Sequence, residues 1–293
     1  MLQEISFIMI RGLGAGALLS LVAMSFNIVH RSSHILNFAQ GNLLILAGLM
    51  AVLFYAPDAS VWFWVLSLLA TAVIMGVLVG AQGYMTLVPL NYSMERDSWL
   101  ITTMAVSVIV GAILLLTQGP FVLTAISPFP NFSMFGVSSP APYALCILLA
   151  AVWYVGLHWF VTRWPAGLAI NALSQDYDAA RAAGLPVRRL QVLAFVISGV
   201  ILGTAGFVAA PMMTISPDTG FRYVINGFIA TIIGGMGNNT GAIIGGPIVG
   251  VVSMLATYQL GGEYESTVLF ALMIVVLMLR PQGIFGNTAA RRV

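Results

Sequence analysis

The side chains that could do chemistry are few, and they gather in three short stretches. The most polar stretch is residues 171–190, which hold two of the nine carboxylates and three of the eleven arginines. Amides follow one another closely at Asn37, Gln40 and Asn42, and two threonines stand at residues 102 and 103. Each charge costs about 3 kcal/mol at the centre of a membrane helix. Because long apolar runs flank residues 171–190, we expect this stretch on a membrane face, where a soluble partner could bind it.

The amide run allows two interpretations. Amides on membrane helices avoid lipid and face other helices or a polar cavity. They could cap a helix and form an interhelical hydrogen bond, or they could line a route for a solute. The candidate residues for a translocation pathway are Asn37, Gln40, Gly41, Asn42, Thr102 and Thr103.

Several kinds of chemistry have no residues to support them. The chain contains no lysine, so a G-x-x-x-x-G-K-[ST] phosphate loop cannot form, and any ATP must be bound by another subunit. His30 and His34 have a spacing that suits a metal on a helix, but no carboxylate or third ligand lies near them in the sequence. Cys146 is the single cysteine. We predict no catalytic residue, metal site or cofactor in this chain.

The composition predicts an all-α, polytopic membrane bundle that forms one domain over residues 1–293. The chain is 60% hydrophobic and 7% charged, whereas soluble domains are roughly 25% charged. Met1 to Ser20 lacks the basic region of a cleavable signal peptide. A membrane helix needs about 20 apolar residues. Candidate spans are residues 5–29, 35–55, 61–87, 98–117, 141–161, 191–212, 222–235, 241–260 and 266–279.

The number of spans is eight or nine, because two of them are short. The seventh and ninth have 14 residues each, and the glycine-rich seventh and eighth could form one re-entrant hairpin. Spans one and two also loosely resemble spans six to eight in composition, and spans one and six run in opposite directions. This is the arrangement of an inverted repeat.

The distribution of arginine sets the orientation, because cytoplasmic loops are enriched in basic residues. With nine spans and an external N-terminus, nine arginines fall inside and only Arg11 and Arg222 fall toward the outside. Residues 171–190 and the C-terminus are then cytoplasmic. Residues 118–140 are external and contain four prolines and four phenylalanines. This loop could cover an outer mouth, dock an external partner or simply anchor at the interface.

The polar stretch carries a motif found in transporters. Asp178-Ala179-Ala180, followed three residues later by Gly184, resembles the E-A-A-x-x-x-G loop of bacterial ABC importer permeases, with Asp in place of Glu. In that family the short helix docks into a groove of the ATPase subunit. The resemblance implies a coupling helix in which Asp178, Arg181 and Arg188 pair across the interface and Ala179 and Ala180 permit close approach. We expect Ala180 to face the ATPase, and Gly184 to end the helix in the left-handed conformation.

Four further motifs narrow the resemblance. Residues 36–41, L-N-F-A-Q-G, resemble the L-N-F-A-H-G signature of branched-chain amino-acid permeases. L-I-T-T with Ser107, the G-G-M-G run that starts at residue 234 and the R-P-Q-G-I-F-G run that starts at residue 280 also resemble motifs of this family. The chain is therefore similar to the shorter, LivH-type permease subunit. The family residues expected at Gln40 and Asn42 are histidine and an acid, so the cargo of this chain could differ.

The resemblance implies a full importer in a bacterial inner membrane. Its expected partners are a second permease subunit, two cytoplasmic ATPases that bind ATP and Mg, an external binding protein and the lipid bilayer, with no nucleic acid. Two alternatives remain at the level of the sequence. The cargo could be urea, a short amide or an aromatic acid, or the chain could be a standalone secondary transporter or channel.

Overall fold

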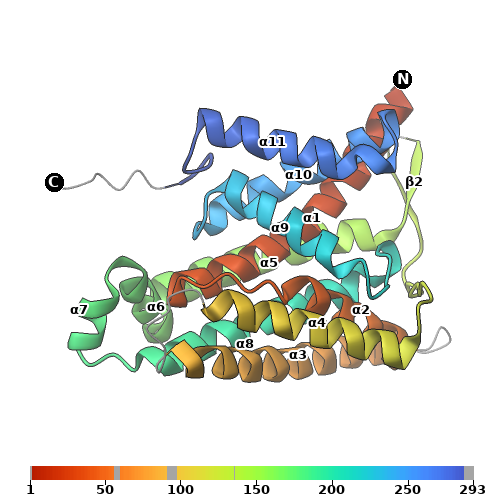
Figure 1. Cartoon of the computed structure of the whole chain (residues 1–293). Helices are drawn as coiled ribbons and strands as arrows, with labels where there is room; N and C mark the ends of the chain where they lie inside the picture. Colours follow the sequence, from red (N-terminus) through yellow and green to blue (C-terminus); the bar gives the residue numbers. More distant parts are fainter. Residues whose placement is uncertain (1, 56–59, 91–97, 135, 287–293) are drawn as a thin grey trace.

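The computed structural model describes residues 2–55, 60–90, 98–134 and 136–286, which form a helical bundle with one small β-hairpin (Figure 1). The longer helices are α1 (Leu2–Ser33), α3 (Val61–Leu90), α4 (Ser98–Gln118), α5 (Ala141–Arg163), α8 (Val187–Ala209), α10 (Asn239–Gln259) and α11 (Glu265–Leu279). The shorter elements are α2 (Gln40–Phe54), α6 (Pro165–Gln175), α7 (Tyr177–Ala182), α9 (Gly220–Gly234), the 3-10 turns η1 (Ala210–Met212) and η2 (Gly262–Tyr264), and the strands β1 (Phe132–Met134) and β2 (Val137–Ser139).

All nine predicted spans fall on helices of the described chain, and seven of these helices are long and apolar enough to cross a membrane. The two exceptions are α2 and α9, which have 15 residues each. A helix of that length reaches about 22 Å, less than the hydrocarbon thickness of about 30 Å. Helix α9 matches the short predicted span 222–235, whereas α2 begins five residues after the start of the predicted span 35–55.

Each short helix follows a non-helical stretch that completes its path through the bundle. Before α2, the backbone of His34 turns into the left-handed region at φ 56°, and helix resumes only at Gln40. Before α9, residues 213–219 contain Pro217, and Ile215 pairs with Leu123 of the loop after α4. Helix α10 has 21 residues and is long enough to cross alone, which argues against a re-entrant α9–α10 hairpin.

The helix contacts follow the predicted inverted repeat. Helix α1 packs along α10 as α8 packs along α3, while α4 covers α2 and α3 as α11 covers α9 and α10. Helices α1 and α8 also contact each other, as do α2 and α9. Figure 1 shows α1 and α8 running in opposite directions. Helices α5 to α7 lie between the two repeats in the sequence.

Small residues allow the two long helix pairs to approach closely. A Cβ atom at Gly16 of α1 would collide with the backbone of Gly246 and Pro247 in α10. A Cβ atom at Gly199 of α8 would likewise collide with the backbone of Met75 in α3. These glycines therefore serve tight packing, which in lipid replaces the hydrophobic effect between helices.

The two ends of the bundle differ in their charge. At the α7 end, at the left of Figure 1, α1, α5 and α11 end and α8 begins, and these segments and α7 carry six arginines, Arg31, Arg163, Arg181, Arg188, Arg189 and Arg280. The opposite end carries β1 and β2 and is called the hairpin end below. Arg11 in the first half of α1 and Arg222 in the first turn of α9 lie toward this end. Arg96, Arg291 and Arg292, which the topology prediction counts as inside, lie outside the described residues. The predicted external loop contains the β-hairpin, which the sequence pattern did not indicate.

Candidate translocation site and coupling helix

The N-terminal ends of the two short helices meet inside the bundle. A Cβ atom at Gly41 of α2 would collide with the carbonyl oxygen of Gly220, and one at Gly220 would collide with the side chain of Asn42. Only glycine permits this approach of one backbone to the other. The first turn of each helix has N–H groups without partners within the helix, and the helix dipole makes that end positive. This crossing, called the central break below, is a polar interruption in an apolar core.

Gln40 lies at the central break and links three helices. Its side chain is 0% exposed, and its Nε2 donates to Ser198 Oγ of α8 at 3.3 Å. Ser198 Oγ in turn donates to Ser25 Oγ of α1 at 3.2 Å. The Oε1 atom of Gln40 is buried and has no hydrogen-bond partner among the described residues. A buried acceptor without a partner costs about 1–3 kcal/mol, so this atom is a ready binding group.

Asn37 has the structural role that the sequence allowed as an alternative. Its Nδ2 donates to Gln82 Oε1 at 3.1 Å, and Gln82 Nε2 donates back to its Oδ1 at 2.7 Å. The same Oδ1 accepts from the backbone N–H of Ala39, just before α2. Asn37 therefore caps the entry to α2 and ties it to α3. In this conformation the side chain of Asn37 has no free polar group that could bind a solute, so nothing supports its predicted place in the pathway.

Asn42 joins α2 to one face of α4. Its Nδ2 donates to both the carbonyl oxygen of Ser107, at 2.7 Å, and Ser107 Oγ, at 3.0 Å. Thr103 precedes Ser107 by one turn, is fully buried and donates its hydroxyl to Leu100 O. Thr102 is partly exposed and donates to Trp99 O. The structure thus brings Gln40, Gly41 and Asn42 to the break, whereas the threonine hydroxyls bond within α4.

Sequence reasoning missed four residues of this site, which are Ser25, Gln82, Ser198 and Gly220. Ser25, Gln82 and Ser198 lie within apolar segments, and Gly220 follows the polar loop residues 216–219, so none of the four lies near the 37–42 amide run in the sequence. Their positions become informative only once the repeat pairs α1 with α8 and sets α2 against α9. Ser25 and Ser198 then lie on the two facing helices of the repeat. This pairing is the one signal that could have found them.

Helix α7 protrudes at the α7 end and is defined by its caps. Asp176 Oδ1 accepts from the N–H of Ala179 at 2.9 Å and so caps the N-terminus, with Asp178 in the first turn. At the other end Gly184 N–H donates to Arg181 O and Leu185 N–H donates to Ala180 O. These are the two bonds of a Schellman motif, and Gly184 has φ 81° as predicted.

Ala180 does not face outward, although the sequence predicted that it would. Its side chain is only 6% exposed and packs against the chain's own core, so it does not face a partner. The Schellman turn explains this, because it brings Leu185 back against the residue at position 180. All other residues of α7 are exposed, namely Tyr177, Asp178, Ala179, Arg181 and Ala182. They form the face that remains free for another subunit.

A second cluster at the α7 end holds the glycine-rich turn after α9. Asn27 of α1 donates to Asn238 O at 3.0 Å and accepts from Gly237 N–H at 2.8 Å, while Arg31 Nε donates to Gly237 O at 2.6 Å. Asn238 Nδ2 then donates to Phe285 O at 2.8 Å. The G-G-M-G and R-P-Q-G-I-F-G motifs therefore belong to one hydrogen-bond network that joins α1, the turn after α9 and the segment after α11.

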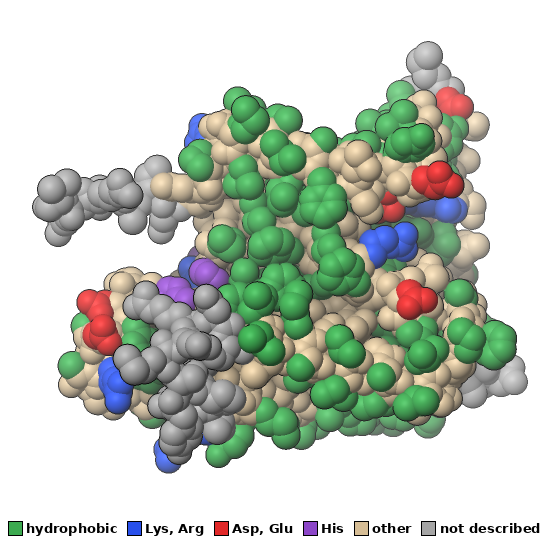
Figure 2. Space-filling view, in the orientation of Figure 1, with side chains coloured by type: hydrophobic (Ala, Val, Ile, Leu, Met, Phe, Trp, Pro, Cys, Tyr) green, Lys and Arg blue, Asp and Glu red, His purple; other side chains and the backbone are tan. Residues whose placement is uncertain are grey.

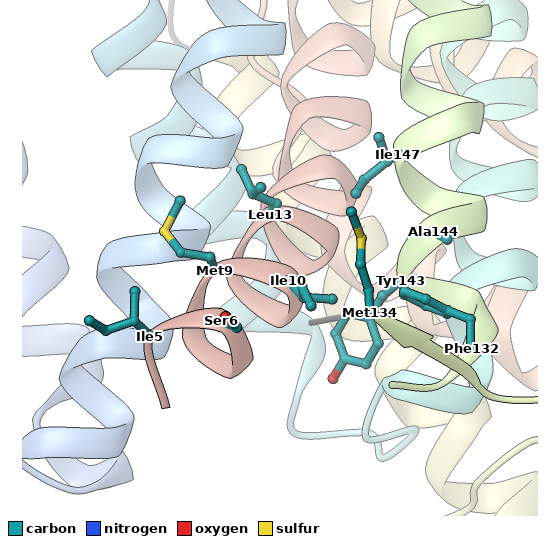
Figure 3. A pocket seen from close by; sticks show the side chains of 10 residues that line it. All are labelled: Ile5, Ser6, Met9, Ile10, Leu13, Phe132, Met134, Tyr143, Ala144 and Ile147. Atoms are coloured by element: carbon teal, nitrogen blue, oxygen red, sulfur yellow. The ribbon is translucent and has the colours of Figure 1, made fainter. Parts of the chain in front are cut away.

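Two other kinds of binding site lack the necessary groups. Among the described residues, no group of three or more His, Cys, Asp and Glu could hold a metal ion. At the hairpin end, a cavity of about 430 Å³ lies between α1, β1 and α5 (Figure 3). None of the ten residues around it is charged, and Ser6 and Tyr143 carry its hydroxyls. It cannot pair with both charges of an amino acid.

Comparison with known proteins identifies the family. Residues 8–277 match the family described as "Branched-chain amino acid transport system / permease component". The permease protein LivH of the high-affinity branched-chain amino acid transport system of Salmonella typhimurium is 27% identical, and the match covers 97% of this chain and 96% of LivH. The permease protein LivM of the Escherichia coli system is 30% identical over 73% of this chain and 56% of LivM.

A solved structure, PsaBC from Streptococcus pneumoniae in complex with Fab, has a TM-score of 0.48 and 12% identity, covering 94% of this chain and 92% of that one. The family match itself extends from α1 into α11. Permease subunits are transport components rather than enzymes. The chain belongs to the permease family of branched-chain amino acid transport systems.

Proposed function

We propose that this chain is the LivH-type permease subunit of an ABC importer and that it moves a branched-chain or similar small amino acid across the bacterial inner membrane. The family match over residues 8–277 and the full-length likeness to a LivH permease support the class of function. The central break supports the route. Its polar groups are the ones a zwitterion would need inside an apolar bundle.

The observation that carries this proposal is the unpaired Oε1 of Gln40 beside two helix N-termini. A carbonyl oxygen accepts hydrogen bonds from an ammonium group, and the N–H groups of a helix N-terminus bind a carboxylate. The surrounding side chains include Val224, which lies against Gly41, so an aliphatic side chain also finds apolar contacts. The solute reaches these groups when α2 and α9 move apart, because the two backbones now touch.

The remaining subunits of the importer are also proposed. A second permease suits the exposed apolar side chains of α4 and α11, such as Leu116 at 85% and Met278 at 81% exposure, and the likeness to LivM supports a heterodimer. Two ATPases would bind ATP and Mg, and an external binding protein would deliver the solute. Helix α7, with Asp178, Ala179 and Arg181, would contact an ATPase, whereas Arg188 lies on α8 with its guanidinium over the ring of Tyr84. The ATPase contact requires the α7 end to be cytoplasmic and the N-terminus external.

The test is uptake of radiolabelled leucine into proteoliposomes that contain the permease with its cognate second permease, ATPases and binding protein. We expect accumulation that requires ATP on the ATPase side and the binding protein on the other. Leucine uptake that proceeds equally without ATP would show a passive channel and would contradict the proposal. Uptake of urea or an aromatic acid in preference to leucine would keep the importer and replace the cargo.

A further inference from the structure

A basic cavity lies at the α7 end, beside the coupling helix and separate from the central break. It has a volume of about 570 Å³ and lies between the end of α1, the end of α3, α7 and the start of α8. Its polar lining comes from Ser33, His34, Tyr177, Arg181, Arg188 and Gln191. None of the ten described residues around it is acidic. The cavity therefore offers hydrogen-bond donors around an excess of positive charge.

Among the described residues, no carboxylate forms an ion pair with either arginine of this cavity. Within the part of the chain that the structure describes, the recorded ion pair is Arg222 with Glu265, toward the hairpin end. The guanidinium of Arg188 lies 4.5 Å from the ring centre of Tyr84 in α3, so it is held against the bundle and does not extend toward a subunit below it. Unpaired arginines beside a polar cavity attract an anion, most strongly one with phosphate geometry.

The surface around the cavity suits a lipid. Arg188 and Val187 also border a neighbouring cavity of about 820 Å³, which Tyr84, Arg189 and Val192 line further. On α3 the apolar side chains of Met85 and Val77 are 67% and 64% exposed, so the surface that leads away from the two cavities is apolar. Figure 2 shows basic side chains at the end of the molecule that carries α7 and the start of α8, next to apolar side chains of the bundle.

From this arrangement we propose that the cavity binds the phosphate headgroup of an anionic phospholipid, with Arg181 and Arg188 as its charge partners and the acyl chains along α3. The lipid then connects the coupling helix α7, through Arg181, to α3 and α8, which pack along each other. Basic pockets between membrane helices on the cytoplasmic side suit such headgroups. The proposal does not depend on which amino acid is transported.

The test uses the purified full-length permease in detergent, with its partner subunits where they co-purify. Dioleoyl phosphatidylglycerol is titrated and its retention is measured by native mass spectrometry, against dioleoyl phosphatidylcholine. We expect preferential retention of phosphatidylglycerol. An attraction of about 1 kcal/mol for each arginine predicts roughly thirtyfold weaker binding by the Arg181→Gln/Arg188→Gln double variant. The matched control is Arg163→Gln/Arg280→Gln, which removes two exposed arginines at the same end that do not line the cavity.

Three results would overturn the proposal. Equal retention of the two lipids by the wild-type protein would show that headgroup charge is not recognised. An equal loss in the control pair would show a nonspecific effect of charge. Displacement of phosphatidylglycerol by millimolar inorganic phosphate would show a site for the free anion. Loss of leucine uptake in proteoliposomes with normal lipid retention would count against the proposed transport function alone.

Discussion

At the scale of single residues, the amides of the 37–42 run have different roles although they lie within six positions. Asn37 is fully paired with Gln82, whereas Gln40 keeps a buried acceptor without a partner among the described residues. The sequence placed both on the pathway because amides avoid lipid, and it had no means of showing where their partners lie. A long-range hydrogen bond is set by the packing of α2 against α3 and α8.

The Asn37–Gln82 pair gives a direct test of the packing role. Asn37→Leu leaves both polar groups of Gln82 buried without partners and should lower the free energy of unfolding by about 1–3 kcal/mol. Gln82→Leu should cost a similar amount. The double variant should lose less than the sum, because neither side-chain amide of the pair remains buried without its partner, and the Ala39 N–H loses its acceptor in both proteins that carry Asn37→Leu. Detergent melting curves of the four proteins measure this, and strictly additive losses would disprove the pairing.

At the scale of the elements, the motif in α7 predicted the length and the end of the helix but not its buried side. The spacing of Asp178 and Gly184 correctly indicated a short helix that ends in a left-handed glycine. It did not show which side faces outward, because a helix of six residues has too few positions to define an apolar face. Ala180 is conspicuous in the motif and yet supports the helix from inside.

Two tryptophan substitutions separate the faces of α7. Ala179→Trp adds a large side chain to the exposed face and should abolish co-purification of the ATPase while leaving the melting temperature of the permease unchanged. Ala180→Trp inserts the same side chain into a packed core and should lower stability by about 1–3 kcal/mol. A pull-down with the cognate ATPase and a melting curve measure both. Normal ATPase recovery by Ala179→Trp would remove α7 from the interface.

Gly184→Val tests the C-cap of the same helix. The Cβ atom of valine would meet open space, so the cost arises from the left-handed backbone alone, about 1–2 kcal/mol. We expect a small loss of melting temperature and a larger loss of ATPase binding, because the turn after α7 must change its path. Gly156→Val, also in open space but on α5, serves as the control. Equal ATPase binding by both variants would show that the cap does not position α7.

At the scale of the whole molecule, composition was sufficient for the class and insufficient for the architecture. Low charge predicted a helical membrane bundle, and weak similarity between halves predicted the inverted repeat that the helix contacts now show. Hydropathy placed residues 35–39 in the second span because they are uncharged, although helix α2 begins only at Gln40. The central break lies where α2 and α9 begin. The sequence therefore indicated Gln40, Gly41 and Asn42 but not the crossing of the two helices.

The orientation of the bundle is tested on the same scale. Single cysteines at Ala183, at the α7 end, and Ser138, on the exposed side of β2, are placed in a Cys146→Ala background, since Cys146 is fully buried. In intact cells an impermeant thiol reagent should label Ser138→Cys and spare Ala183→Cys. Permeabilised cells should label both. The reverse pattern in intact cells would invert the molecule and remove α7 from the cytoplasm.

The central claim is that the solute passes through the break at Gln40, and its most direct measurement is leucine uptake by Gln40→Leu in proteoliposomes. Leucine retains the volume but supplies no acceptor, and Ser198 keeps its bond to Ser25. The control is Gln191→Leu, another buried amide, which donates to Ser32 O away from the break. With equal assembly and ATP hydrolysis, loss of one hydrogen bond to an ammonium group, about 1.5–3 kcal/mol, predicts roughly tenfold to hundredfold lower uptake for Gln40→Leu and normal uptake for the control. Normal uptake by Gln40→Leu would contradict a route through the break.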